Sequence, residues 1–196
     1  MERLDRQFDF IREIDQEKEI FRQNYLADGS RKENDAEHAW HMALMAILLS
    51  EYANEPIDVL KTVTMILLHD VVEIDAGDTY AYDEAAKQSQ AERERKAAQR
   101  IFGLLPPDQA ETMRGLWEEF EAQATPEARF ARTMDNLQPL VLNDASEGKS
   151  WVEHGVHLHQ VCQRNQRTHE GSQVLWDYAK ERLLRPNVEK GHLKPG

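Results

Sequence analysis

Residues 65–70 read Met65-Ile66-Leu67-Leu68-His69-Asp70, an apolar run that ends in a histidine and an aspartate. Four consecutive apolar residues indicate a buried segment, and the two polar residues stand at its end. From there both side chains can reach one ion if the helix end lies over a cleft. On the dipeptide alone, a solvated aspartate and a partly buried histidine are the more ordinary interpretation.

The rest of the chain indicates an all-α protein. It has nine Gly and seven Pro in 196 residues, and no long alternation of apolar and polar residues that would predict a sheet. Asn34 with Glu37 predicts a capping box, and Asp75 to Asp83 is expected to be a loop. The helices are expected over residues 3–25, 34–53, 56–72, 83–102, 106–122 and from 126 onward, with one or two more over 151–184 and Gly171 as a possible break.

Two helical faces are expected to be buried. In the first helix the stripe includes Leu4, Phe8 and Ile11, and in the helix that starts at Pro126 it holds Phe130, Met134, Leu137 and Val141. The pattern indicates a single domain over residues 1–185, followed by a flexible tail over 186–196.

Composition excludes several classes of protein. The 24 Lys and Arg against 36 Asp and Glu give a net charge of −12, which disfavours DNA as a partner. Cys162 is the only cysteine, so an internal disulfide and a thiolate metal cluster are excluded. The apolar runs are too short to span a membrane, and the start of the chain has no apolar signal core. We expect a cytoplasmic protein.

Two more polar residues at core edges strengthen the interpretation of His69 and Asp70 as metal ligands. His38 is held above Met42 and Met45 on one helical face, and His41 shares that face and competes for the role. Asp135 follows Met134 on a largely apolar helix, a costly place for a carboxylate without a partner. The predicted ligand set is His38, His69, Asp70 and Asp135.

Two imidazoles and two carboxylates can hold one divalent ion with a position open for water, as metal-assisted hydrolysis requires. Such mixed nitrogen and oxygen ligation leaves Mn, Fe, Co, Ni, Zn and Mg as candidates. Glu73 stands one turn after Asp70 and could orient or deprotonate water, and Asp78 could protonate a leaving oxygen.

The residues 31–38, together with His69-Asp70-Val71-Val72-Glu73 and Gly77-Asp78, resemble the HD-domain metal-dependent phosphohydrolases, in particular the group that contains the 5′-deoxynucleotidases. The resemblance covers roughly the first 145 residues. It implies an all-α HD helical bundle, one divalent metal on the four ligands, and Glu73 and Asp78 as catalytic residues. It also implies hydrolysis of 2′-deoxynucleoside 5′-monophosphates, and a homodimer.

The stretch Ile14 to Arg22 lacks an Arg-Trp pair with which the characterised nucleotidases contact phosphate and sugar. Lys18 or Arg22 could replace the phosphate contact. Arg31 matches a family position near the ligands and is the first choice, although an arginine before a helix is more often a surface group.

Several alternatives remain. Another small nucleotide or phosphate ester could be the substrate, although Ile74 after Glu73 argues against a pyrophosphorylated alarmone, and triphosphate hydrolases of this fold are generally longer. A non-catalytic metal- or nucleotide-binding module is the rival class. Tyr80 and Tyr82 could stack on a base or only pack their loop. A second metal site is disfavoured for the remaining cluster, His154, His157 and His159.

Overall fold

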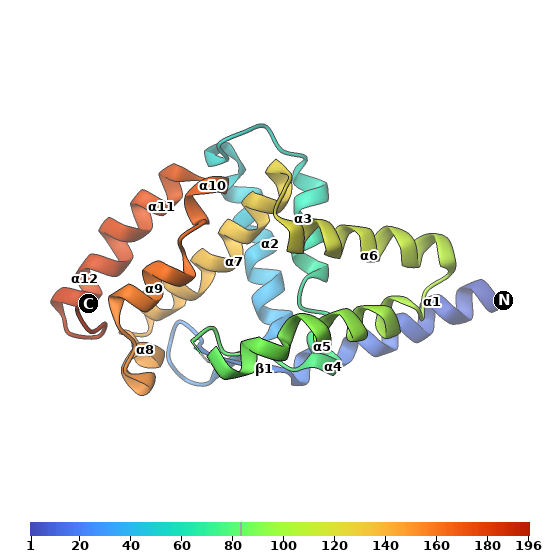
Figure 1. The fold of residues 1–196 in the computed structure, drawn as a ribbon, viewed down its shortest axis with the longest axis horizontal. Helices are drawn as coiled ribbons and strands as arrows, with labels where there is room; N and C mark the ends of the chain where they lie inside the picture. The colour runs from blue at the N-terminus through green and yellow to red at the C-terminus, as the bar shows by residue number, and fades with distance from the viewer. Residues whose placement is uncertain (83) are drawn as a thin grey trace.

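The structure is a computed structural model that describes residues 1–82 and 84–196 (Figure 1). The prediction of an all-α fold is confirmed, since only a small two-stranded sheet interrupts the helices in these ranges. In the described ranges, every helix is too short or too polar to cross a bilayer. The first elements are α1 (Glu2–Glu13), η1 (Ile14–Glu19), β1 (Phe21–Tyr25), β2 (Lys32–Asn34), α2 (Asp35–Leu49), η2 (Ser50–Tyr52), α3 (Val59–Leu68) and α4 (Glu73–Ala76). The later elements are α5 (Glu84–Phe102), α6 (Pro107–Ala122), α7 (Pro126–Ala145), α8 (Lys149–His154), α9 (Leu158–Arg164), α10 (Thr168–Gly171), α11 (Gln173–Ala179), η3 (Lys180–Leu184) and α12 (Arg185–Glu189).

Helix α7 runs through the middle of the molecule and contacts α2, α3, α6 and α10 (Figure 1). Helices α1, α5 and α6 extend toward the amino-terminal end, and α8 to α12 lie on the opposite side. The main core joins the fully buried Met134 of α7 to Met42 of α2 and Met65 of α3. Burial of such side chains contributes about 1.5–3 kcal/mol each, so this core fixes the three helices that carry the predicted ligands.

The amino-terminal segment differs from its prediction as one helix over residues 3–25. Helix α1 ends at Glu13, η1 follows, and β1 pairs antiparallel with β2, with Phe21 opposite Asn34 and Tyr25 opposite Lys32. After Ile14, η1 has only polar residues, so the apolar stripe of α1 does not continue through it. The predicted burial of that stripe is also wrong, because three of its side chains are exposed: Leu4, Phe8 and Ile11.

Helix α2 confirms the capping box. The Glu37 amide donates to Asn34 Oδ1 at 2.9 Å, and the Asn34 amide donates to Glu37 Oε2 at 3.3 Å. These bonds satisfy amides that have no partner within the helix, and the cap sets where α2 begins.

Helix α3 is shorter than predicted at both ends. It starts at Val59, because Asp58 Oδ1 accepts a hydrogen bond from the Lys61 amide at 3.0 Å and caps it, so Pro56 lies before the helix. It ends at Leu68 instead of Val72. His69 and Asp70 therefore lie in the turn between α3 and α4, where the backbone no longer follows the axis of α3.

The three middle helices begin and end close to their predicted limits, as α5, α6 and α7. The predicted loop is shortened by α4, which reaches Ala76, and its last residue, Asp83, lies outside the described residues. On α7, Val141 is 37% exposed, which corrects its predicted burial. Leu140 continues the buried face after Leu137, as a period of 3.6 residues requires.

The carboxy-terminal part is more broken than predicted, with α8 to α11 and η3 in place of one or two helices. The predicted flexible tail is instead packed on the domain. Leu193 is fully buried, and the Lys194 backbone accepts from the Leu158 amide and donates to Val156. The end of the chain is thereby attached to the start of α9.

Gly171 lets α10 approach α7 closely, and we expect its replacement by alanine to destabilise the protein. An added Cβ would lie 2.4 Å from both the Arg129 carbonyl oxygen and Thr133 Oγ1. Overpacking of this kind costs about 1–3 kcal/mol, which denaturant unfolding of Gly171→Ala would measure. The matched control is Gly115→Ala in the exposed middle of α6, where a Cβ meets no described atom within 4 Å. It should stabilise the protein by up to about 1 kcal/mol. Equal stability of the two variants would contradict the close packing.

Candidate functional site

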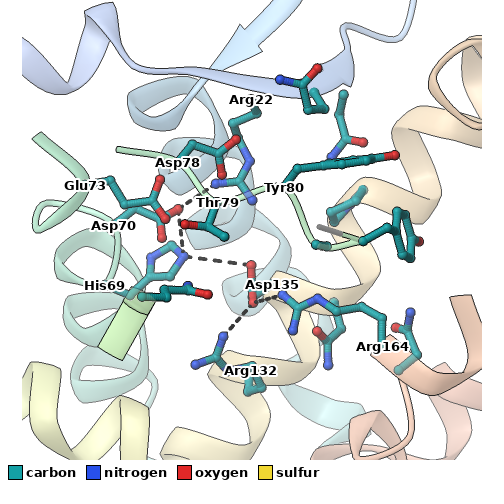
Figure 2. Close-up of a pocket in the computed structure, with 18 of the residues that line it drawn as sticks. Arg22, His69, Asp70, Glu73, Asp78, Thr79, Tyr80, Arg132, Asp135 and Arg164 are labelled. Atoms are coloured by element: carbon teal, nitrogen blue, oxygen red, sulfur yellow. Dashed lines mark hydrogen bonds and ion pairs between the residues drawn. The ribbon is translucent and has the colours of Figure 1, made fainter. Parts of the chain in front are cut away.

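Four polar side chains from three separate elements lie close together, and three of them, His69, Asp70 and Asp135, line one cavity (Figure 2). His38 comes from α2, His69 and Asp70 from the turn after α3, and Asp135 from α7. One ligand atom each from His38, His69 and Asp135 lies within 4.8 Å of the others. Asp70 Oδ2 lies 3.0 Å from His69 Nε2 and 3.9 Å from His38 Nε2. The structure therefore brings together the four residues that the sequence singled out.

Hydrogen bonds on the far side of each ring fix how the imidazoles point. His69 Nδ1 lies 2.7 Å from the Ile66 carbonyl oxygen, which can only accept, so Nδ1 carries the proton. His38 Nδ1 lies 2.9 Å from Gln138 Oε1, and Gln138 in turn donates to Glu33 at 2.5 Å. Both Nε2 atoms therefore present lone pairs toward Asp135 when the rings are neutral.

Asp135 is nearly fully buried, and its two oxygens have different partners. Oδ2 accepts hydrogen bonds from Arg132 at 3.0 Å and Arg164 at 3.1 Å. Oδ1 lies 3.3 Å from His38 Nε2 and 3.9 Å from His69 Nε2. Burial alone would raise the pKa of Asp135, but the imidazoles and the two guanidiniums hold it well below its usual value. The carboxylate is therefore charged and has one oxygen free to ligate.

Arg22 of β1 pairs with the carboxylate of Asp70, the second acidic ligand. Its Nη1 lies 2.8 Å from Asp70 Oδ2 and 3.1 Å from Asp35 Oδ1. Lys18 and Arg31 were also predicted to contact substrate, but the structure places both at the surface. Lys18 pairs with Asp15 and Arg31 with Glu37, and neither is among the described residues that line the cavity.

The donor set fits a divalent metal ion. His69 Nε2 is buried and has no hydrogen-bond partner of good geometry among the described residues. Burial alone would lower the pKa of His69, but the carboxylates of Asp70 and Asp135 raise it to about 10. The carboxylates thus favour a positive charge beside His69. A divalent cation bound there would supply that charge and would also give His69 Nε2 a partner.

The cavity that contains these residues has a volume of about 430 Å³, within the range of small-molecule sites. Glu73 and Asp78 both line it, close to Asp70 (Figure 2). Burial is the main cause that raises the pKa of each carboxyl group, with the charge of Asp70 adding to it. Glu73 Oε2 is buried and has no hydrogen-bond partner in the described part of the chain. Each of the two groups therefore holds its proton to a higher pH than an exposed carboxyl group does.

The other histidines take different positions. His41 Nδ1 lies 3.2 Å from Gln138 Nε2, so His41 contacts a residue that supports His38 and does not join the ligand set. His154 packs against Tyr80 with ring centroids 4.7 Å apart, while the rings of His157 and His159 are 5.5 Å apart. Within the described residues, these three do not form a group with metal-ligand spacing.

Sequence reasoning missed the residues that support the ligands. Arg132 had a signal, since it precedes Asp135 by three residues and so shares its helical face. Arg164 and Gln138 gave no such signal. Arg164 reaches Asp135 only because α9 packs beside α7, and Gln138 looks like any polar helical residue until His38 lies against it.

The helical fold and this histidine–aspartate set define a protein of the HD class: residues 14–176 match the family model described as HD domain, and the chain belongs to that family. Among its curated relatives, 5′-deoxynucleotidase HDDC2 of Homo sapiens is 29% identical over 133 residues, which are 67% of this chain and 64% of the human protein. The protein of the same name from Danio rerio is 27% identical over 139 residues, 70% of this chain and 68% of that protein. This chain therefore matches less than two thirds of the length of the human relative.

A solved structure resembles the chain over nearly its whole length. The crystal structure of a predicted metal-dependent phosphohydrolase from Magnetospirillum magnetotacticum MS-1 is 51% identical, with a TM-score of 0.94 over 98% of this chain and 96% of that chain.

Replacement of the carboxylate of one ligand by a neutral amide should weaken metal binding without unfolding the protein. In Asp135→Asn the two arginines lose a charged acceptor and the site loses an anionic ligand, so we expect affinity for Mn²⁺ or Co²⁺ to fall by more than about 100-fold. Titration calorimetry with each metal would measure this. The control is Asp108→Asn, an exposed aspartate paired with Arg3. Unchanged affinity in Asp135→Asn with a normal melting temperature would remove Asp135 from the ligand set.

Proposed function

We propose that this chain is a metal-dependent phosphohydrolase that converts 2′-deoxynucleoside 5′-monophosphates to deoxynucleoside and phosphate. The observation that carries the proposal is the meeting of His38, His69, Asp70 and Asp135 beside a cavity that is also lined by the carboxyl groups of Glu73 and Asp78 and by three arginines. The names of the relatives from Homo sapiens and Danio rerio support the substrate class.

The four ligands would hold one divalent ion, and Mn, Fe, Co, Ni, Zn and Mg all remain candidates for it. The ion would act as a Lewis acid that withdraws charge from the phosphoryl group. The protein's part is to hold the imidazoles with Nε2 directed inward, through Ile66 and Gln138, and to keep Asp135 ionised.

The guanidiniums of Arg22, Arg132 and Arg164 line the cavity from different sides (Figure 2). Positive groups aimed at a phosphoryl group stabilise the charge that develops on its oxygens. Arg164 keeps about a third of its side chain exposed, and its guanidinium contacts only one oxygen of Asp135. It therefore has donors left for a substrate phosphate, in addition to the predicted contact from Arg22.

Glu73 would accept a proton from the attacking water, and Asp78 would donate a proton to the leaving 5′-oxygen. The raised pKa of both buried groups suits these tasks, since a base must hold the proton that it takes and an acid must carry one to give. Glu73 precedes Gly77 in the chain and Asp78 follows it, so the two side chains would approach the phosphoryl group from separate segments.

We further propose that the chain forms a homodimer through the outer face of α2 and α3. Exposed apolar side chains gather on these two neighbouring helices: Trp40, Leu44, Ile47, Leu48, Leu60 and Leu67. Trp40 is 62% exposed and Leu60 is 76% exposed. Monomeric proteins rarely expose so many large apolar groups together, and a self-complementary pairing would cover them.

Replacement of Glu73 should stop turnover but spare metal binding. We expect Glu73→Gln to lower kcat for phosphate release from 2′-deoxynucleoside 5′-monophosphates by about 10²–10⁴-fold, with metal content unchanged. The control is Glu51→Gln at an exposed position. If the wild-type protein loaded with each candidate metal releases no phosphate, or releases it equally with a chelator, the chain is a binding module and the proposed reaction is wrong.

A charge placed on the outer face of α2 should separate the proposed dimer. Leu48→Glu is expected to sediment as a monomer under conditions where the wild-type chain sediments as a dimer, because the charge would have to be buried without a partner. Val174→Glu, on an exposed position of α11, is the control and should not change the sedimenting mass. A wild-type chain that stays monomeric across the concentration range would overturn the dimer.

A further inference from the structure

The cavity continues from the metal ligands along one face of α7. Asp135, Asn136, Pro139, Leu140 and Asn143 all line it, at the spacing of one helical face. With a rise of about 1.5 Å per residue, Asn143 lies about 12 Å along the helix from Asp135. A ligand whose phosphate is at Asp135 would therefore reach Asn143 with the far end of a nucleoside.

This far end has a different chemistry from the metal end. Its lining side chains are uncharged: Gln23, Asn24, Tyr80, Asn143, Ser150 and Trp151. The charged residues that line the cavity include the ligands Asp70 and Asp135 and the arginines that pair with them. We call Tyr80, Asn143 and Ser150 the distal subsite. Such a wall suits a neutral polar group better than a second phosphate.

Asn143 presents a fixed hydrogen-bond acceptor. It is 3% exposed, and its Nδ2 donates to the Pro139 carbonyl at 2.9 Å and to Asn24 Oδ1 at 3.3 Å. Because a carbonyl can only accept, the Pro139 contact fixes which end of the amide is nitrogen. Oδ1 is buried with no hydrogen-bond partner in the described part of the chain, so it can accept an N–H from a ligand.

Two hydroxyl groups complete the subsite. Ser150 is 1% exposed and lies beside the buried Tyr80 hydroxyl, but neither of the two oxygens has a hydrogen-bond partner of good geometry among the described residues. Buried polar atoms are nearly always satisfied in folded proteins, so three unsatisfied atoms on one cavity wall point to a ligand. The Tyr80 ring also meets Tyr82 edge-on at 5.3 Å and His154 at 4.7 Å, which gives the subsite an aromatic wall.

From these contacts we infer that the distal subsite binds the nucleobase of the substrate, with Asn143 accepting from a base N–H and the hydroxyls of Ser150 and Tyr80 bonding to its other polar edge atoms. This inference rests on the proposed function and names the part of the substrate that the far end recognises. Each common base carries an N–H group, so the subsite distinguishes a nucleotide from a phosphate ester without a base more strongly than one base from another.

The test compares two phosphomonoesters that differ only in the base, 2′-deoxyadenosine 5′-monophosphate and 2-deoxyribose 5-phosphate. Ser150→Ala and Tyr80→Phe each remove one hydroxyl, and Tyr178→Phe at an exposed position is the control. We expect Ser150→Ala and Tyr80→Phe to raise KM for the nucleotide by about tenfold, the effect of one lost hydrogen bond, and to leave KM for the sugar phosphate unchanged. Because neither hydroxyl makes a hydrogen bond of good geometry within the described residues, we expect both variants to melt within about 2 °C of the wild type.

Binding measurements separate this inference from the proposed reaction. Calorimetry with metal-loaded Glu73→Gln, alone and combined with Ser150→Ala, measures nucleotide affinity without turnover. If the wild type shows no hydrolysis but Ser150→Ala still weakens nucleotide binding by about tenfold, the subsite stands and the reaction fails. If the nucleotide does not bind, or both substrates are weakened equally, or neither is weakened, the inference is overturned.

Discussion

The ion pair between Asp135 and its two arginines is the constraint on which the site depends. A charged carboxylate buried in a helical core is costly unless it is paired and hydrogen-bonded. Arg132 and Arg164 meet that need through Oδ2 alone, and so leave Oδ1 directed at the two imidazoles. The arginines come from α7 itself and from α9, so the charge state of one ligand depends on the packing of two helices. This arrangement also explains why the site lies beside the central helix.

A second buried network performs the same task for Asp70. Arg22 joins it to Asp35, and the fully buried Asp35 has a pKa raised to about 7, with burial as the largest cause and the charge of Asp70 next. The small sheet is what brings Arg22 inward, since β1 pairs with β2 immediately before the cap of α2. The two-stranded sheet thus contributes more to the position of Arg22 in the site than to the hydrophobic core.

Much of the site could be predicted from the sequence, because His38, His69, Asp70 and Asp135 each interrupt an apolar helical pattern. Helix α5 was predictable from its charged and amide residues interspersed with alanine, and α6 and α7 from the prolines at their starts. The strand at Phe21 was not predictable, because Phe21 and Tyr25 keep the apolar spacing of the first helix. Only the pairing of β1 with β2, in which Phe21 lies opposite Asn34, makes this segment a strand. The support from Arg164 depends on tertiary packing, which local pattern does not encode.

The docked end of the chain has a mechanical role. The Lys194 carbonyl accepts from the Leu158 amide at the first turn of α9, and Arg164 at the last turn of the same helix grips Asp135. Leu193 anchors this segment in the main core. Residues 193 and 194 therefore hold α9 in place. A change that removes Leu193 from the core would let α9 shift, and would alter the ion pair between Arg164 and Asp135 although Leu193 and Lys194 do not contact Asp135.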